Sequence, residues 1–182
     1  MLIRQAVPGD YPAILALQAE NTPEQLTPLQ RQQGFIVSQM SEKQLASINN
    51  GLGILIATED EQLAGFVCLM QTNAQPRPPV VDAMLHTLAT QRFQDRAMNQ
   101  QRVFLYGPVC LSAKWRGKGV LRQLVAAVKA RTQQDFDVGA LFVNEDNPHS
   151  LAAHVAGLGM TALTTFDCNN QSYQLVVFAT GN

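Results

Sequence analysis

Apolar and polar positions between Val103 and Val128 follow the pattern of a buried strand, a turn and an amphipathic helix. Apolar residues run through 103–106 and again through 109–111, and a short basic turn with two glycines follows them. After this turn the apolar residues recur at helical spacing. A helix begins with backbone N–H groups that carry a partial positive charge, and glycines let an anion approach them. The pattern therefore predicts a phosphate-binding turn at the start of this helix.

Strand and helix patterns alternate on both sides of this unit, which indicates an α/β fold. Before it, they predict a strand over 3–6 and a helix over 11–20 with Asp10 as its N-cap. A second helix follows, which Ser41 and Gln44 cap and which ends at Asn50 and Gly51. Two strands over 52–58 and 62–71 come next. After it, they predict a strand over 138–144, a short helix over 148–157 and a closing pair of strands over 161–166 and 173–179.

A long segment before Val103 interrupts this alternation. Residues 73–79 are rich in proline, which cannot continue a strand. Residues 80–101 are helical in pattern, and one apolar face is made by Val81, Met84, Leu85, Leu88 and Phe93. The predicted segment 73–101 either shapes a substrate groove, or packs as an extra helix or supports a dimer. Residues 34–37, which include Phe35, are interpreted as a second wall of such a groove.

Composition and charge restrict the class of protein. The chain has 182 residues, 46% of them apolar, which is enough for a single domain, 1–182, with a substantial core. Its net charge of −1 indicates no broad surface for nucleic acid or for an anionic membrane. The three cysteines form no CxxC pair and no metal-ligand spacing, and the first residues lack the apolar core of a signal peptide. These features predict a cytoplasmic protein without a metal, a nucleic-acid partner or a membrane partner.

The basic turn departs from two common phosphate-binding motifs. After Gly119 the chain has Val120 and Leu121, so the hydroxyl that a P-loop supplies to Mg²⁺ is missing. Arg122 stands where a dinucleotide fingerprint needs its third glycine. What remains is the pattern R-x-x-G-x-[G/A], in which Arg116 and Gly119 match and Leu121 replaces the usual small residue. This pattern resembles the coenzyme A-binding signature of the GCN5-related N-acetyltransferase (GNAT) superfamily.

A second motif of the same superfamily lies in the last third of the chain. Its members commonly show N-x-x-[AS]-x-x-x-Y-x-x-x-G-F, and Asn147 and Ser150 have the expected spacing. His154 holds the tyrosine position when residues are counted from Asn147, and Val155 holds it when they are counted back from Gly159, because the chain has one extra residue. Together with the order of elements, the two motifs make nearly the whole chain resemble the GNAT superfamily.

The resemblance implies a fold and a cosubstrate. The expected fold is a mixed, mostly antiparallel central sheet that is flanked by helices and opened between its fourth and fifth strands. The expected cosubstrate is acetyl-CoA, with no metal. The backbone around Val109, Cys110 and Leu111 would hold the pantetheine arm and the thioester, with Cys110 packed in the core rather than acting as a nucleophile. The other residues implied in coenzyme binding are Arg116, Gly117, Lys118, Gly119, Val120 and Leu121 at the pyrophosphate, and Asn147 and Ser150. Trp115 either stacks on the adenine or covers the edge of the sheet.

Two residues are candidates for moving protons. Transfer of an acetyl group from a thioester to an amine needs a neutral amine, a donor for the oxyanion and a proton for the departing thiolate. His154 is the candidate for that last proton, because an imidazolium protonates a thiolate near neutral pH; the alternative is a histidine that interacts with a helix dipole. Glu145 is the candidate for the general base, directly or through water, and the alternative is a solvated acid in a loop.

The resemblance implies an N-acetyltransferase that moves an acetyl group from acetyl-CoA to a primary amine of a small molecule or a peptide. The alternative is a non-catalytic module of the same fold that binds acyl-CoA or regulates; Leu121, the missing tyrosine and Met160 in place of phenylalanine support it. A third hypothesis is an interaction subunit that docks a partner through the apolar face of 80–101. The strand over 173–179 leaves a homodimer open, because it could pair across an interface.

Overall fold

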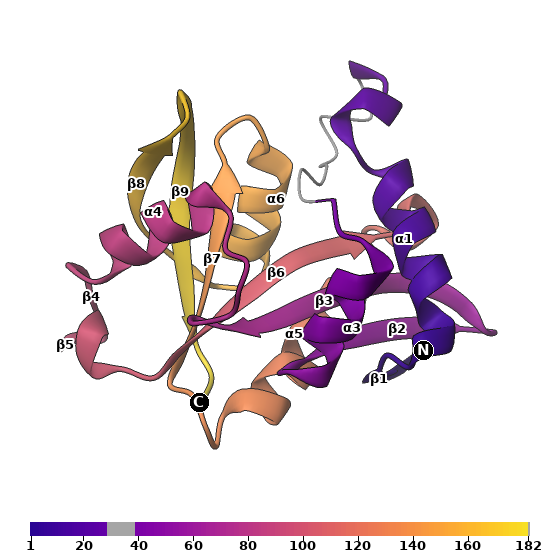
Figure 1. Ribbon diagram of the computed structural model, residues 1–182, viewed down its shortest axis with the longest axis horizontal. Coiled ribbons are helices and arrows are strands. Elements are labelled where there is room, and N and C mark those ends of the chain that lie inside the picture. Colours follow the sequence, from indigo (N-terminus) through magenta and orange to yellow (C-terminus); the bar gives the residue numbers. More distant parts are fainter. Residues whose placement is uncertain (29–38, 182) are drawn as a thin grey trace. The chain divides into compact units, whose positions relative to one another are not determined.

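The computed structural model describes residues 1–28 and 39–181, and the expected wall at 34–37 lies outside them. Seven strands form one sheet in the order β1-β2-β3-β6-β7-β9-β8 (Figure 1). Their bounds are Leu2–Gln5 for β1, Gly53–Glu59 for β2, Gln62–Gln71 for β3, Val103–Leu111 for β6, Val138–Asn144 for β7, Thr161–Cys168 for β8 and Gln171–Ala179 for β9. Strands β6 and β7 are parallel, whereas the pairs β1–β2, β2–β3, β7–β9 and β8–β9 are antiparallel. This is the mixed, mostly antiparallel sheet that the resemblance predicts.

Strand β6 is shared by two compact units of the chain. The first unit comprises Met1–Met70 and Tyr106–Arg131, and the second comprises Gln71–Leu105 and Thr132–Asn182. The parallel register of β6 with β7 pairs Val103 with Val138 and ends at the pair of Leu105 with Ala140. Strand β6 continues to Leu111 and β7 continues to Asn144. The register therefore ends where β6 enters the first unit.

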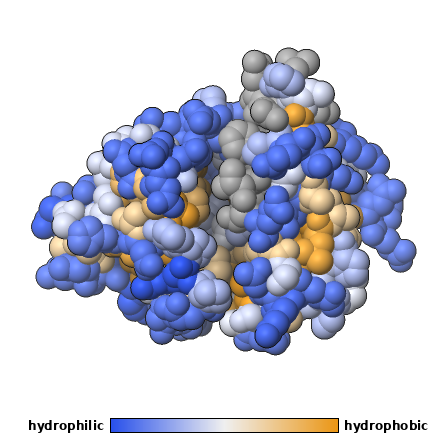
Figure 2. Space-filling view, turned by 45° about the horizontal axis from the view of Figure 1, so that its top comes forward, coloured by the Kyte–Doolittle hydropathy of each residue, from blue (hydrophilic) through white to orange (hydrophobic). Residues whose placement is uncertain are grey.

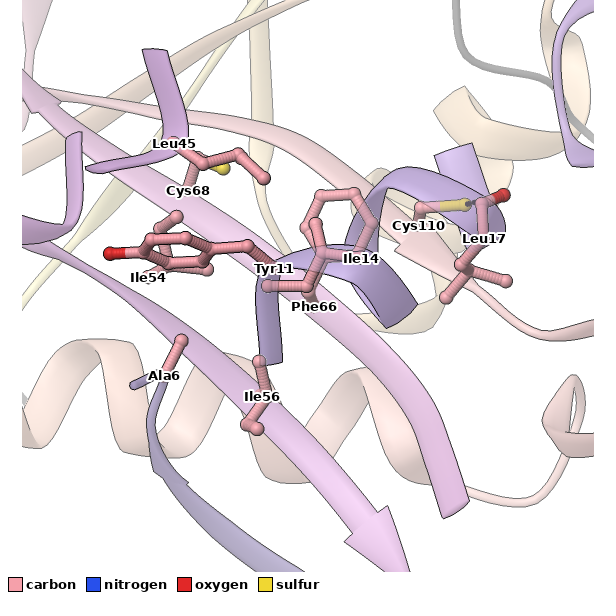
Figure 3. Close-up of a cluster of buried hydrophobic side chains, with 10 residues drawn as sticks. All are labelled: Ala6, Tyr11, Ile14, Leu17, Leu45, Ile54, Ile56, Phe66, Cys68 and Cys110. Atoms are coloured by element: carbon pink, nitrogen blue, oxygen red, sulfur yellow. Dashed lines mark hydrogen bonds between the residues drawn. The ribbon is translucent and has the colours of Figure 1, made fainter. Parts of the chain in front are cut away.

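Two helices of the first unit, α1 (Tyr11–Glu20) and α3 (Glu42–Asn50), pack on β2 and β3. A cluster of buried residues, each at most 6% exposed, joins them (Figure 3): Ala6, Tyr11, Ile14, Leu17, Leu45, Ile54, Ile56, Phe66, Cys68 and Cys110. Ser41 caps α3, and Gln44 returns a hydrogen bond to its N–H, as the capping-box spacing predicts. Helix α5 (Val120–Thr132) follows β6 and buries Leu124 and Val128.

Asp10 stands at the N-cap position of α1, as predicted, but its side chain makes no capping hydrogen bond there. Its carboxylate accepts two hydrogen bonds from the Arg4 guanidinium, at 2.7 and 2.9 Å, and one from the N–H of Val7. Hydrogen bonding to Arg4 lowers the pKa of Asp10 below its ordinary value. The aspartate therefore ties β1 to the start of α1 instead of satisfying the free N–H groups of that helix.

The helix predicted over 80–101 is too long. In the second unit, α4 (Pro79–Leu88) ends at Leu88, and a small hairpin follows, with strands Arg92–Phe93 (β4) and Arg96–Ala97 (β5). Its turn residues, Gln94 and Asp95, both have positive φ, as in the two-residue turns that match strand twist. Phe93 therefore belongs to a strand and not to a helical face. The apolar residues of such short strands can fall at helical spacing, so the pattern predicted a helix that extends too far.

The apolar face of α4 is not available to a partner. Helix α4 packs against β8, and its residues Val81 and Leu88 are only 8% and 4% exposed. The exposed large hydrophobic residues among those described are Met1, Leu2 and Val7. The face of the molecule in Figure 2 is mostly hydrophilic, with hydrophobic residues gathered in smaller patches. The structure thus contradicts docking through this face.

Strand β9 cannot form a dimer contact by strand pairing, because it pairs with β7 on one side and with β8 on the other. Strand β9 therefore offers no free edge through which a homodimer could form. At the sheet's interior β9 contributes Leu175, Val176 and Val177, all 0% exposed. Burial on both faces explains why its sequence is a continuous apolar run.

The turn between β2 and β3 offers a stabilising substitution. Asp60 and Glu61 have φ of 48° and 64°, a left-handed conformation that costs an L residue about 1 kcal/mol. An Asn-Gly pair adopts it more readily. For the double variant Asp60→Asn, Glu61→Gly we expect the free energy of unfolding to rise by about 0.5–1 kcal/mol. Urea unfolding measures the difference, and a lower midpoint in the variant would contradict the prediction.

Arg102 and Asp137 form an ion pair in the second unit whose pH dependence can be measured. The guanidinium and the backbone N–H of Arg102 both donate to the carboxylate. These hydrogen bonds lower the pKa of Asp137 to about 2. A carboxyl group whose pKa is lowered by folding stabilises the folded state above its unfolded pKa, and this contribution is lost as the pH falls toward 2.

In Arg102→Ala we expect the pKa of Asp137 to rise toward its ordinary value of 3.8. It should not reach that value, because the backbone N–H of residue 102 still donates to the carboxylate. Titration of the Asp137 carboxyl group by NMR measures the pKa in both proteins. A pKa that stays at about 2 in the variant would show that Arg102 is not the cause.

Candidate functional site

The basic turn before α5 leaves its backbone open to a ligand. A 3₁₀ turn over Ala113–Trp115 follows β6, and α5 begins at Val120, which is 1% exposed and anchors the start of the helix. Gly117 and Gly119 have φ of 70° and 78°, a left-handed conformation that favours glycine. A Cβ added at either glycine would have no atom within 4 Å. Open space therefore lies beside both glycines, at the end of α5 that attracts anions.

Arg116 is held by Asn21, a residue that no sequence motif indicated. Its Nη2 donates to Oδ1 of Asn21 at 2.7 Å, and Nδ2 of Asn21 donates to the carbonyl of Leu17 at 2.8 Å. Asn21 follows the last residue of α1 and is 5% exposed. The guanidinium therefore fixes the turn to the end of α1. Asn21 precedes Arg116 by 95 residues, so no local pattern links them.

The backbone of strand β6 is irregular at Gly107, whose φ of 120° lies in the region that favours glycine. Val109 and Leu111 are half-buried, and Cys110 is 6% exposed, with Sγ 3.9 Å from the carbonyl oxygen of Leu17. Burial raises the pKa of the Cys110 thiol to about 12. The thiol is therefore protonated at neutral pH and lies in the core, as predicted.

In the second unit, Asn147 and Ser150 lie at the start of a helix that ends in an unusual turn. Helix α6 spans Pro148–Ala152 and continues as a π-helical turn over Ala153–Gly157. The N–H of Leu151 donates to the carbonyl of Asn147, which is the ordinary α-helical spacing. A π-helical turn contains one residue more than an α-helical turn, and such turns often occur at functional sites.

The hydrogen bonds at the end of this turn locate the extra residue of the motif. In a Schellman motif the left-handed glycine bonds a carbonyl three positions back, and the next residue bonds one five positions back. Here Gly159, with φ of 73°, bonds the carbonyl of Val155, and Met160 bonds the carbonyl of His154. Both bonds span one residue more than usual. The extra residue therefore lies after His154, and the count from Asn147 to His154 is uninterrupted.

His154 is buried in the π-helical turn in a defined tautomer. It is 2% exposed, and its Nδ1 lies 2.8 Å from the carbonyl oxygen of Ser150. Because a carbonyl only accepts hydrogen bonds, Nδ1 carries a hydrogen, and in the neutral ring Nε2 has the lone pair. Burial lowers the pKa of His154 below its ordinary value, against the opposing hydrogen bond to Ser150. The ring is therefore mainly neutral at pH 7.

Glu145 and Asn147 follow the end of β7. The Glu145 side chain is exposed, and its Oε1 accepts a hydrogen bond from Nε2 of Gln174 at 3.5 Å. Its backbone N–H donates to the carbonyl of Ser172 at 3.0 Å, which fixes the position of the chain after β7. Asn147 is 7% exposed, and its side chain makes no capping hydrogen bond to α6. The capping role that the position before Pro148 would allow is therefore not the one that its side chain plays in this structure.

The predicted site residues divide between the two units. In the first, Arg116 belongs to the turn that carries the open glycines, and Val109, Cys110 and Leu111 lie on β6. In the second, Ser150 and His154 are in direct contact, and Glu145 and Asn147 stand between β7 and α6. Each motif thus forms one local arrangement within its own unit.

Within residues 1–28 and 39–181, no helix has both the length and the apolar composition needed to span a membrane. The same ranges contain no group of three or more His, Cys, Asp or Glu side chains that could hold a metal ion.

Solved structures share the fold over the whole chain. One is smu.2055 from Streptococcus mutans UA159, with a TM-score of 0.69, 16% identity and 100% of both chains covered. Another is ribosomal-protein-alanine N-acetyltransferase from Brucella melitensis, with a TM-score of 0.62, 20% identity, and 98% of this chain and 99% of that chain covered. A third is yncA from Salmonella typhimurium with its cofactor acetyl-CoA, with a TM-score of 0.64, 13% identity, and 100% of this chain and 95% of that chain covered.

These identities are low, so the likeness establishes the fold alone. No curated protein matches the sequence significantly. The family model described as the acetyltransferase (GNAT) family matches residues 14–160, which include both motifs and most of the sheet. The chain therefore belongs to the acetyltransferase (GNAT) family.

Proposed function

We propose that the protein is an N-acetyltransferase that moves the acetyl group of acetyl-CoA to a primary amine of a small molecule or a peptide. The observation that carries this proposal is the open turn at Gly117 and Gly119, at the start of α5, in a chain of the GNAT family. Two of the similar structures support it further: one contains acetyl-CoA, and another is named as an N-acetyltransferase of a ribosomal-protein alanine.

The residues of the turn suit the pyrophosphate of the coenzyme. Backbone N–H groups from Gly117 to Leu121 would donate to its oxygens. Arg116 would act by holding the turn, since Asn21 takes one of its donors. The backbone of Val109 to Leu111 would bind the pantetheine arm and the carbonyl oxygen. Coenzyme contacts of Asn147 and Ser150, which belong to the second unit, stay a prediction.

The proton steps are assigned to Glu145 and His154. Glu145 takes a proton from the ammonium form of the acceptor, which leaves a neutral amine. As the amine nitrogen bonds to the thioester carbon, Nε2 of His154 accepts a second proton from that nitrogen. When the C–S bond breaks, the imidazolium gives this proton to the thiolate. The tautomer supports this role, because Nδ1 is bonded to the Ser150 carbonyl and Nε2 holds the lone pair.

A second candidate function is a module that binds acyl-CoA without turnover. The observation in its favour is that the ring of His154, at the usual tyrosine position, is mainly neutral and so is a poor proton donor at pH 7 without first accepting a proton. Leu121 and Met160 in place of the usual residues also favour it. Both candidates require the same coenzyme site.

Calorimetric titration with acetyl-CoA, followed by an assay of released coenzyme A thiol, tests both. The amines to be tried are a polyamine, an amino acid, an aminoglycoside and a peptide with a free N-terminus. Binding with turnover is the expected result. Binding without turnover of any amine would favour the module, and the absence of binding would contradict both candidates.

A further inference from the structure

Two lysines gather at the single tryptophan of the chain, in the turn that precedes α5. The Nζ atoms of Lys114 and Lys118 lie 5.3 Å and 5.2 Å from the centroid of the Trp115 ring. Both lysines are exposed, and Trp115 is half-buried. The ring attracts each ammonium group through its negative face. Trp115 thus holds two positive charges on one small area of the surface.

No carboxylate in the described part of the chain neutralises these two charges. The ion pairs found there involve the amino group of Met1 and the side chains of Arg4, Arg77 and Arg102. Lys114 instead donates to the uncharged Oε1 of Gln62 at 3.1 Å. Two ammonium groups at one ring repel each other, and a compact anion that binds both would remove this repulsion.

We propose that Lys114 and Lys118 bind the 3′-phosphate of coenzyme A, so that the protein distinguishes coenzyme A from dephospho-coenzyme A. This inference rests on the proposed function, because a pyrophosphate at Gly117 and Gly119 brings the adenosine end of the coenzyme to the turn. Lys118 stands between the two glycines, and Lys114 lies on the 3₁₀ turn just before them. Lysine binds phosphate as a point charge and needs no fixed fork geometry, which suits a phosphate at an exposed position.

Trp115 has a defined part in this arrangement. Its ring serves as a platform that keeps both ammonium groups beside the turn, rather than as a stacking surface for adenine. As the only tryptophan of the sequence, it also reports directly on the two lysines. A phosphate that draws the ammonium groups away from the ring will change the Trp115 emission spectrum.

The test compares coenzyme A with dephospho-coenzyme A, which lacks only the 3′-phosphate. Calorimetry and Trp115 fluorescence measure the binding of both ligands. We expect the parent to bind coenzyme A about tenfold more tightly, each of Lys114→Ala and Lys118→Ala to retain a preference of about threefold, and the double variant to have none. Lys43→Ala removes an equal charge from the exposed face of α3 and should keep the parent's preference.

The outcomes separate this inference from the proposed function. Equal affinity of the parent for both ligands would overturn the inference while the coenzyme site stands. Alanine variants that lose affinity equally for both ligands would place the lysines at the pyrophosphate and would also overturn it. Binding of neither ligand by the parent would contradict the proposed function and this inference with it. Raised salt should weaken the preference, because both lysines are exposed.

Discussion

Gly119→Glu should lower the affinity for acetyl-CoA by at least about 100-fold while the protein remains folded. The space beside residue 119 is empty, since an added Cβ would meet no atom within 4 Å. A longer side chain can therefore enter the place proposed for the pyrophosphate and bring a carboxylate against its negative charge. The φ of 78° adds strain for a residue with a Cβ, which costs about 1–2 kcal/mol and leaves a folded protein.

Gly119→Gln is the matched control, because glutamine has the same shape as glutamate without the charge. It should lower the affinity about tenfold, by covering backbone N–H groups. Calorimetry with acetyl-CoA gives the affinities, and thermal unfolding shows that both variants are folded. Equal losses in the two variants would exclude an electrostatic effect on a bound anion, and parent-like binding by Gly119→Glu would show that the turn does not hold the pyrophosphate.

His154→Phe should lower kcat by about 10²–10³ while the affinity for acetyl-CoA changes by less than about threefold. Phenylalanine fills the buried site but can neither accept nor donate a proton. In the parent, burial lowers the pKa of His154 below its ordinary value, so Nε2 is mainly unprotonated at neutral pH. Activity should therefore fall as the pH decreases through that pKa, and this part of the pH profile should be absent in the variant.

His154→Tyr is the rescue variant, since it differs from His154→Phe by one hydroxyl group at the position where GNAT proteins commonly have tyrosine. It should recover part of kcat. Calorimetry and thermal unfolding of both variants show whether the site remains folded and binds acetyl-CoA. A kcat of His154→Phe within twofold of the parent would show that His154 does not transfer the proton and only packs in the π-helical turn.

Local pattern was sufficient for most elements of the sheet. The strand predicted over 138–144 coincides with β7, and the one over 62–71 coincides with β3. The cap at Ser41 and Gln44 is also as predicted, because a capping box closes within four residues. These features depend on neighbours in the sequence, and so the sequence contains what is needed to place them.

The segment from 80 to 101 shows where local pattern fails. Its apolar residues fit one helix, yet the chain leaves the helix at Leu88 and turns at Gln94 and Asp95. Burial of Val81 and Leu88 within the second unit, where α4 packs on β8, accounts for the helical part alone. The chain could follow the periodicity of a helix or that of a strand. Packing on β8, which is distant in the sequence, decided where the helix is formed.

For the candidate site, three features could be predicted from the sequence: the basic glycine turn, the spacing of Asn147, Ser150 and His154, and the family. Glycine in a turn and residues four apart on a helix have local consequences, which a pattern can express. Three other features could be seen only in the folded chain. Asn21 holds Arg116, a π-helical turn places the extra residue after His154, and the His154 ring is buried with Nδ1 bonded to the carbonyl of Ser150. The burial of His154 and the bond to Asn21 arise from contacts between distant segments, and burial sets the protonation state on which the proposed chemistry depends.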